Sequence, residues 1–187
     1  MWLKKKVSNL NVEVKRLDTL ATGVVQQHSG SATVVSISDI AQGDTDITRD
    51  GNSLKCTNLS IRLGLGKPSV DTEQTVRFMV FKCLGPSSAA SVTELLEDPT
   101  TSLETWRNID RSRNYKVLID DFITMAENGD TTERFRTYNR KIMSHIKYDN
   151  SAGNSAQYGG LFYLIMTDEA TNRASYSVST RLRFVDN

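Results

Sequence analysis

The strongest constraint on the fold is a strict alternation of residue types near the C-terminal end of the chain. Tyr176, Val178, Thr180, Leu182 and Phe184 occupy one set of alternate positions, and serines and arginines occupy the other set. Successive side chains of a β-strand point to opposite faces of its sheet, so this pattern predicts a strand with one face in a core. The rest of the chain therefore has to supply a sheet that this strand can join.

Seven earlier segments also have the character of strands. In the segment 53–65 the phase of the alternation changes near Thr57 and Asn58, which predicts a β-bulge there. The segment 76–83 is apolar on both faces at its centre, which is typical of a strand covered on each side, so we expect it to be central. The predicted strands are residues 20–27, 32–37, 53–65, 76–83, 116–125, 135–148, 161–167 and 176–184.

Helix is nearly absent between these segments. Ser91 and Glu94 have capping-box spacing, and Pro99 follows, so residues 91–97 are predicted to form one short helix in a long loop. A chain of 187 residues is long enough for one substantial core and short for two domains. Long, uneven connections favour a jelly roll over an up-and-down barrel. The sequence thus predicts an all-β protein, a single eight-stranded jelly roll of two packed antiparallel sheets.

The first 18 residues have a different pattern. Their apolar residues recur with spacings of three, four and three, which is typical of an amphipathic helix of about four turns. We expect a basic leader over residues 1–18, ahead of a jelly-roll domain over residues 19–187. The helix either packs on its own domain or bundles with neighbouring subunits, and two heptads allow both. The apolar stripe is Val7, Leu10, Val14 and Leu17, and the basic residues beside it are Lys4, Lys5, Lys6, Lys15 and Arg16.

Charge and cysteine content limit the function and the compartment. The chain has 23 basic and 22 acidic residues, which excludes a uniformly basic nucleic-acid binder and makes the position of each charge important. Two cysteines, Cys56 and Cys83, are too few for a disulfide framework. No apolar run approaches the length of a membrane span, and the first residues lack the apolar part of a secretion signal. We expect a soluble protein without a membrane partner, made in the cytosol.

Metal-binding motifs are weak. Asp44, Asp46 and Asp50 alternate as in a calcium loop, but Arg49 and Lys55 stand where an EF-hand requires Gly and Glu. A polar turn between strands is the preferred interpretation, and the three carboxylates are kept as weak metal candidates.

Catalytic motifs are weaker still. His28 and His145 are far apart in the sequence and do not form a metal cluster by themselves. Asp120 and Asp121 lie inside a predicted strand, and we interpret them as a loop end or an interface pair instead of an acid–base dyad. The sequence predicts no enzymatic activity and no cofactor.

Several segments occur in a distinctive order. Residues 40–44 and 49–54 precede the long strand through 59–62, and the segments 76–81, 91–96, 160–165 and 180–186 follow. In order and spacing they resemble the capsid proteins of satellite plant viruses and of small viruses with circular single-stranded DNA genomes. The resemblance covers residues 40–187. Such proteins usually begin with a long Arg-rich arm, whereas this chain has only five basic residues among its first 16.

The resemblance implies a viral coat protein found in the virion and made in the host cytoplasm. It implies self-assembly into a closed T=1 icosahedral shell, or virus-like particle, of about 60 copies that packages a single-stranded DNA or RNA genome. The alternative is a non-viral jelly-roll module that binds carbohydrate or single-stranded nucleic acid. The sequence shows no row of aromatics for sugars, and residues 134–141 are the one segment that mixes basic and aromatic residues.

The family's strand order also predicts where three arginines lie. It makes residues 60–65 and 181–183 antiparallel neighbours in an inward-facing sheet, so alternation projects Arg62, Arg181 and Arg183 toward the particle interior. There they contact either the genome or an Asp or Glu of a neighbouring subunit. The basic residues of the leader are expected to contact nucleic acid as well, while its apolar stripe contacts symmetry-related copies.

Overall fold

The computed structural model of the chain describes residues 13–26, 32–66, 73–100, 103–125, 133–149 and 153–186. Strands and two single-turn helices account for the regular structure of these ranges. The strands are β1 (Val14–Val25), β2 (Val34–Ser36), β3 (Ser53–Gly66), β4 (Gln74–Cys83), β5 (Tyr115–Met125), β6 (Glu133–Tyr148), β7 (Ala156–Tyr158), β8 (Leu161–Thr167) and β9 (Ser175–Asp186). The helices are η2 (Ser87–Ala89), a 3₁₀ turn, and α2 (Val92–Leu95).

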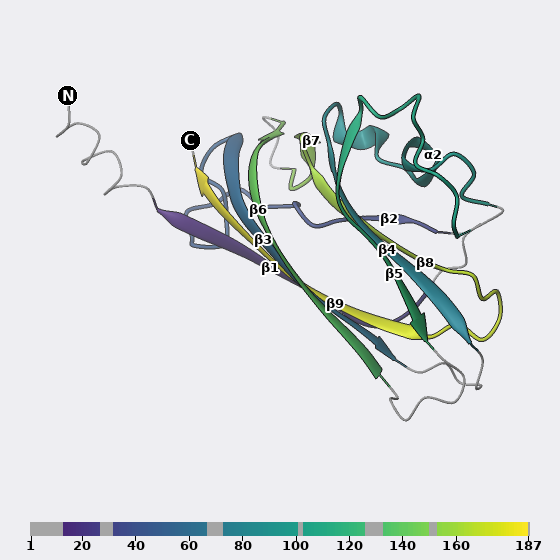
Figure 1. The fold of residues 1–187 in the computed structure, drawn as a ribbon. Helices are drawn as coiled ribbons and strands as arrows, with labels where there is room; N and C mark the ends of the chain where they lie inside the picture. Colours follow the sequence, from purple (N-terminus) through teal and green to yellow (C-terminus); the bar gives the residue numbers. More distant parts are fainter. Residues whose placement is uncertain are drawn as a thin grey trace.

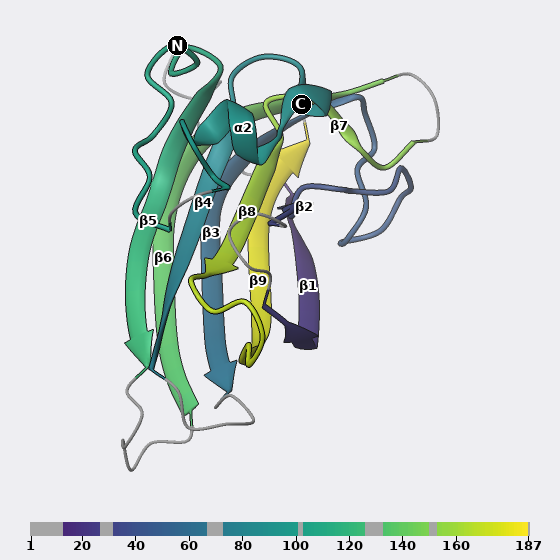
Figure 2. The same cartoon turned by 90° about the vertical axis from the view of Figure 1, so that its right-hand side faces the viewer.

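The strands form two sheets that face each other (Figures 1 and 2). One sheet has the order β1-β9-β3-β6-β7 and the other has the order β2-β8-β4-β5, with antiparallel pairing throughout. The first and last strands are neighbours, and successive strands alternate between the sheets except for β4 and β5, which share one sheet, and β6 and β7, which share the other. This is the jelly roll that the sequence predicts, with the three-residue β7 as an addition to the eight expected strands.

The core lies between the two sheets. Leu59, Ile61 and Leu63 of β3 are almost completely buried, as are Leu182 and Phe184 of β9. They pack with apolar residues of β4 and β8 in one cluster. Complete burial stabilises by about 1.5–3 kcal/mol for each large apolar side chain, so the alternation in these two strands fixes which face of the sheet is internal.

The predicted bulge in β3 is confirmed. The register of β3 shifts between Cys56 and Asn58 in its pairing with both β6 and β9. Leu54 and Cys56 are buried before the shift, and Leu59 and Ile61 are buried after it. The extra residue reverses the phase of the strand, so both halves direct their apolar side chains into the core.

The connection between β4 and β5 covers the outer face of the four-stranded sheet. β4 lies between β8 and β5, as predicted for a strand that is apolar on both faces. Within the connection, the Ser91 side chain accepts a hydrogen bond from the Glu94 backbone N–H (3.2 Å), which caps α2. A second apolar cluster joins this connection to the sheet through Met79, Phe81, Leu95, Leu96, Leu103, Phe162, Leu164 and Met166.

The expected leader helix is wrong where it overlaps β1. Val14 and Leu17 belong to a strand that pairs with β9, not to a helix. Residues three apart share a helical face but point to opposite faces of a strand, and accordingly Val14 is 63% exposed whereas Leu17 packs against the core. Val7, Leu10 and the lysines at 4–6 lie outside the described residues, where the leader stays a prediction.

Both cysteines are buried free thiols. Burial raises the pKa of Cys56 to about 12 and that of Cys83 to about 11. In the ranges that the structure describes, no helix is long and apolar enough to cross a membrane.

Candidate nucleic-acid interface

The outer faces of the two sheets differ in what covers them. The four-stranded sheet is covered by the chain's own β4–β5 connection, whereas the outward side chains of β1, β9, β3 and β6 are mostly exposed. Strand alternation and register give the charged residues on this face. They are the basic residues Arg16, Lys55, Arg62, Lys141, Lys147, Arg181 and Arg183 and the acidic residues Asp18 and Glu133, and we refer to this surface as the basic face.

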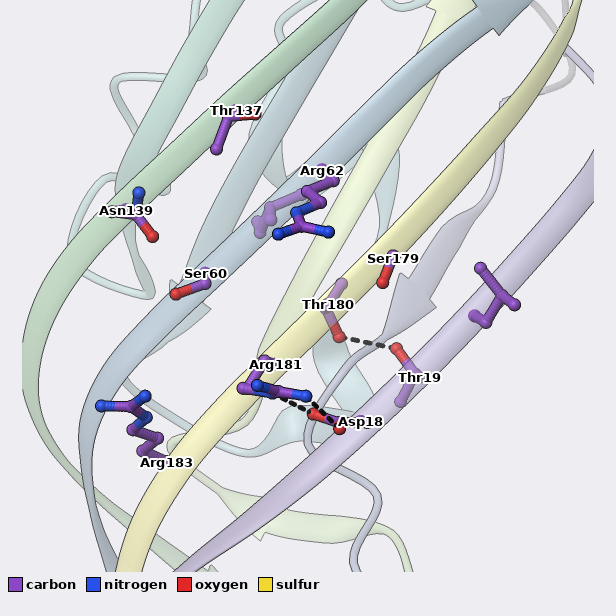
Figure 3. Close-up of a pocket in the computed structure, with 12 residues that line it drawn as sticks. Asp18, Thr19, Ser60, Arg62, Thr137, Asn139, Ser179, Thr180, Arg181 and Arg183 are labelled. Atoms are coloured by element: carbon purple, nitrogen blue, oxygen red, sulfur yellow. Dashed lines mark hydrogen bonds and ion pairs between the residues drawn. The ribbon is translucent and has the colours of Figure 1, made fainter.

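A hollow of about 480 Å³ lies in the middle of the basic face (Figure 3). All four long strands contribute to it, because β1, β9, β3 and β6 are consecutive in the sheet. Arg62, Arg181 and Arg183 stand among short polar side chains that can donate or accept hydrogen bonds. These polar side chains are Ser60, Thr137, Asn139 and Ser179.

Arg181 is neutralised inside the chain. Its Nε donates to one carboxylate oxygen of Asp18 and its second guanidinium nitrogen donates to the other, both at 2.8 Å (Figure 3). This bidentate arrangement is the strong geometry for an arginine and a carboxylate. The hydrogen bonds from Arg181 hold the pKa of Asp18 below its usual value. The sequence expectation named the genome or a neighbouring subunit as the partner, and the structure supplies a carboxylate of the same subunit.

Arg62 and Arg183 have no such partner. Within the described part of the chain, neither forms an ion pair. Their register partners on the neighbouring strands are uncharged, except that Arg16 is opposite Arg183. Arg183 lies between Arg16 on β1 and Asn58 on β3. Like charges opposite each other on a sheet repel by about 1 kcal/mol or less in water, and a bound polyanion removes that penalty.

Lys15 is a correction to the sequence expectation. It lies on the inner face of β1 and is only 2% exposed, with its Nζ 2.6 Å from Asp50 and 3.1 Å from Asp186. The hydrogen bond to Asp50 is the main cause of its raised pKa. Lys15 therefore ties β1 to the β2–β3 connection and to β9, and it does not face a nucleic acid on the basic face. Arg16, the next residue, does lie on that face and is exposed.

The weak metal candidates do not gather into a site. Asp50 pairs with Lys15, while Asp44 and Asp46 are exposed in the β2–β3 connection. Among the described residues, no group of three or more His, Cys, Asp or Glu side chains is arranged to hold a metal ion.

Asp120 and Asp121 point to opposite faces of β5, as adjacent strand residues must. Asp120 accepts two hydrogen bonds from Arg77 (2.9 and 3.0 Å) and one from Arg107 (3.1 Å). Asp121 accepts a hydrogen bond from the Tyr138 hydroxyl on β6 (2.7 Å), and this bond connects the two sheets. The pair is therefore neither a loop end nor an acid–base dyad. Each carboxylate holds a different part of the fold together.

Sequence reasoning missed the contribution of β6 to the basic face. The signal is present in the sequence, because Ile142, Ile146 and Tyr148 are apolar at even positions near the end of this strand. All three are buried, which places the odd positions outward. Extending that parity back along the strand puts Phe135, Thr137, Asn139 and Lys141 on the basic face.

Comparisons with known proteins add the following findings. No family model matches the chain, and no curated protein matches it either. Among solved structures, the chain is similar to one of Desmodium yellow mottle tymovirus, with 10% identity, a TM-score of 0.43 and coverage of 94% of this chain and 88% of that chain. For a structure of Cocksfoot mottle virus the identity is 10% and the TM-score 0.43, and the similarity covers 95% of this chain and 96% of that chain. For Turnip yellow mosaic virus the identity is 8% and the TM-score 0.41, and the similarity covers 92% of this chain and 93% of that chain.

Proposed function

We propose that this chain is a viral capsid protein that assembles with copies of itself into a closed icosahedral shell and packages a single-stranded genome. The basic face is the surface that meets the nucleic acid. The observation that carries the proposal is the contrast between the outer faces of the two sheets. One is largely covered by the chain's own connection, and the other presents seven basic and two acidic side chains around a polar hollow.

The charges on this face suit a polyanion whose sequence is not read. Arginine and lysine contact phosphates without base specificity, and serine, threonine and asparagine side chains add hydrogen bonds to phosphate and sugar. The net charge of the whole chain is only +1, so the acidic residues lie mostly elsewhere and the basic face is a local concentration of charge. Packaging is therefore promiscuous and sensitive to salt.

The finer points of the proposal come from the sequence resemblance to satellite-virus-type capsid proteins. They are a T=1 shell of about 60 copies and a place in the virion. The sequence pattern adds a structural role without enzymatic activity, and the basic leader predicted over residues 1–18, of which Val14–Asp18 belong to β1, adds basic residues inside the particle. A monomeric jelly-roll module that binds single-stranded nucleic acid is the second candidate, because the same face would serve it.

Sedimentation of the purified full-length chain separates the two candidates. About 60 copies of a 20.9-kDa chain weigh about 1.3 MDa, so a shell sediments far ahead of a monomer. We expect uniform small particles in negative stain that contain nucleic acid. A chain that stays monomeric under all assembly conditions while binding oligonucleotides would overturn the capsid proposal in favour of the module.

A further inference from the structure

Phe135 is a large aromatic residue exposed on the basic face. It lies on β6 and is 69% exposed, although it sits in a well-formed strand of a five-stranded sheet. Its partner in the register of β3 is Gly64. A Cβ atom on Gly64 would come within 3.1 Å of the Phe135 ring, so the ring lies against the backbone of β3 at a position without a side chain. The contact with β3 fixes the ring while most of its surface stays open to solvent.

The exposed ring adjoins the cationic hollow. Thr137, two residues further along β6, lines the hollow and is the register partner of Arg62. Diagonal neighbours on one face of a sheet are about 7–8 Å apart, which places Arg62 beside Phe135. Arg62 is exposed and forms no ion pair within the described ranges. An aromatic surface and an unneutralised guanidinium thus lie side by side on a flat polar surface.

We propose that Phe135 is a stacking platform for an unpaired base of a single-stranded nucleic acid whose phosphates contact Arg62 and Arg183. This inference rests on the proposed function and deepens it, since it names the form of nucleic acid that the basic face accepts. Stacking of bases on aromatic side chains beside a basic groove is the general mode of sequence-tolerant single-strand binding. A base inside a duplex is already stacked and paired, so only an unpaired base has a free face to offer.

The surroundings of Phe135 favour nucleic acid over an apolar protein partner. A partner that covered Phe135 with an apolar surface would also cover Arg62 and Thr137, and burying those groups without hydrogen bonds is costly. A nucleotide can both cover Phe135 and give Arg62 a hydrogen-bonding partner, because its base is a flat apolar surface and its phosphate pairs with the guanidinium.

Strand geometry also selects Phe135 within the segment that mixes basic and aromatic residues. Tyr138, the other aromatic residue of that segment, is on the inner face and donates its hydroxyl to Asp121. Its ring stacks on Phe78 of the facing sheet, with centroids 5.6 Å apart. Tyr138 is therefore part of the fold, and Phe135 is the aromatic residue of this segment that a ligand can reach.

The test compares two fluorescent probes of equal length and charge, oligothymidylate and an oligomer of abasic deoxyribose phosphate. Both are titrated against full-length subunits freed of nucleic acid in high salt and kept unassembled. We expect the native protein to bind oligothymidylate more tightly than the abasic oligomer. Phe135→Leu should weaken oligothymidylate binding by about 5- to 150-fold and leave abasic binding unchanged, while Phe135→Tyr should restore the preference.

Two controls separate stacking from structural effects. Met143 is an exposed apolar residue on the same strand and face, at 63% exposure, and Met143→Ala should leave both affinities unchanged. Phe135→Leu retains the apolar cover over Gly64, so its thermal unfolding midpoint should stay close to that of the native protein. A loss of both affinities together in Phe135→Leu would overturn the stacking role.

The failure of this inference is distinguishable from failure of the proposed function. Equal binding of the two probes by the native protein, weakened for both by Arg62→Gln and Arg183→Gln, would overturn stacking and leave the basic face as a phosphate-binding surface. Absence of binding to either probe would overturn both. Unchanged oligonucleotide affinities with loss of shell assembly in Phe135→Leu would assign the ring to a contact between subunits and overturn the inference.

Discussion

Asp18 on β1 and Arg181 on β9 form a bidentate ion pair on the basic face, with both hydrogen bonds at 2.8 Å. The two residues are register partners in neighbouring strands, 163 positions apart in the sequence. Strand alternation predicts the same outward position for Arg62, Arg181 and Arg183, and this ion pair distinguishes Arg181 from the other two. Arg181 already has a carboxylate, whereas Arg62 and Arg183 remain available to a polyanion.

Neutralising Asp18 should strengthen nucleic-acid binding. Asp18→Asn removes the carboxylate that occupies Arg181 and raises the charge of the basic face by one. We expect tighter binding of single-stranded oligonucleotides and a steeper salt dependence, with a slope larger by about 0.7, the value for one more phosphate contact on a single strand. Both partners are about half exposed, so the thermal unfolding midpoint should hardly change. An unchanged salt slope would show that Arg181 does not reach the ligand.

Single arginine substitutions should have unequal effects on the nucleic-acid content of assembled particles. Arg62→Gln and Arg183→Gln each remove an unpaired charge, so both should lower the 260/280 nm absorbance ratio of purified shells. Arg181→Gln should lower it less, since Asp18 already neutralises that charge. Normal filling of shells by all three variants would contradict the genome role, and a failure to form shells would assign these residues to an interface.

Lys15 should contribute to stability and not to packaging. Lys15→Met leaves Asp50 and Asp186 without their cation, and the lost charged hydrogen bonds should lower the free energy of unfolding by about 1.5–3 kcal/mol. The pKa of Lys15 is raised in the folded state. Its stabilising effect is therefore complete below the ordinary pKa near 10.5 and is lost as the pH rises through the folded value. Denaturant unfolding at pH 8 and above pH 10.5 should show a difference between native protein and Lys15→Met that shrinks at high pH.

Asp120 should hold the β4–β5 connection on its sheet. It accepts hydrogen bonds from Arg77, which also donates to the backbone carbonyls of Leu103 and Thr105 (2.9 and 2.7 Å). Asp120→Ala leaves the buried Arg77 uncompensated and should cost about 3–5 kcal/mol of unfolding free energy. Arg107→Gln removes a partner that is 52% exposed and should cost far less. Limited proteolysis should cut residues 97–114 faster in Asp120→Ala, and equal cleavage of both variants would contradict this role.

The two thiols should be inert in the folded protein. Burial raises the pKa of Cys83 to about 11 and that of Cys56 to about 12, so almost no thiolate is present at pH 8. A disulfide reagent should label neither residue in native protein and both in denaturant. Rapid labelling under native conditions would show that the sheets open locally.

The alternation of residues made much of the fold predictable. The resemblance predicts that β3 and β9 are neighbours. The alternation places Leu59 and Leu182 inside, because a one-residue slip in either strand would expose its entire apolar set. The bulge at Cys56–Asn58 follows from the same rule, since apolar residues change phase there.

The parts that were not predictable depend on contacts between distant residues. The sequence around Lys15 suggests a surface residue, but in the fold Asp50 and Asp186 surround its ammonium group. The helical spacing of Val14 and Leu17 likewise predicted a helix where β1 lies, because local spacing does not show the pairing with β9. The Asp18–Arg181 pair is invisible for a related reason, because nothing in the local sequence around Asp18 points to β9.

The position of β1 also determines when the basic face comes into existence. Among the described strands, β1 lies at the edge of its sheet next to β9, and Val14 pairs with Val185. Contacts between residues this far apart close slowly, and they cannot close at all before the ribosome has made residues 175–186. A nascent chain therefore has β1 but lacks the surface that β1 helps to build. Under the proposed function, this face cannot bind nucleic acid until residues 175–186 have been synthesised and have paired with β1.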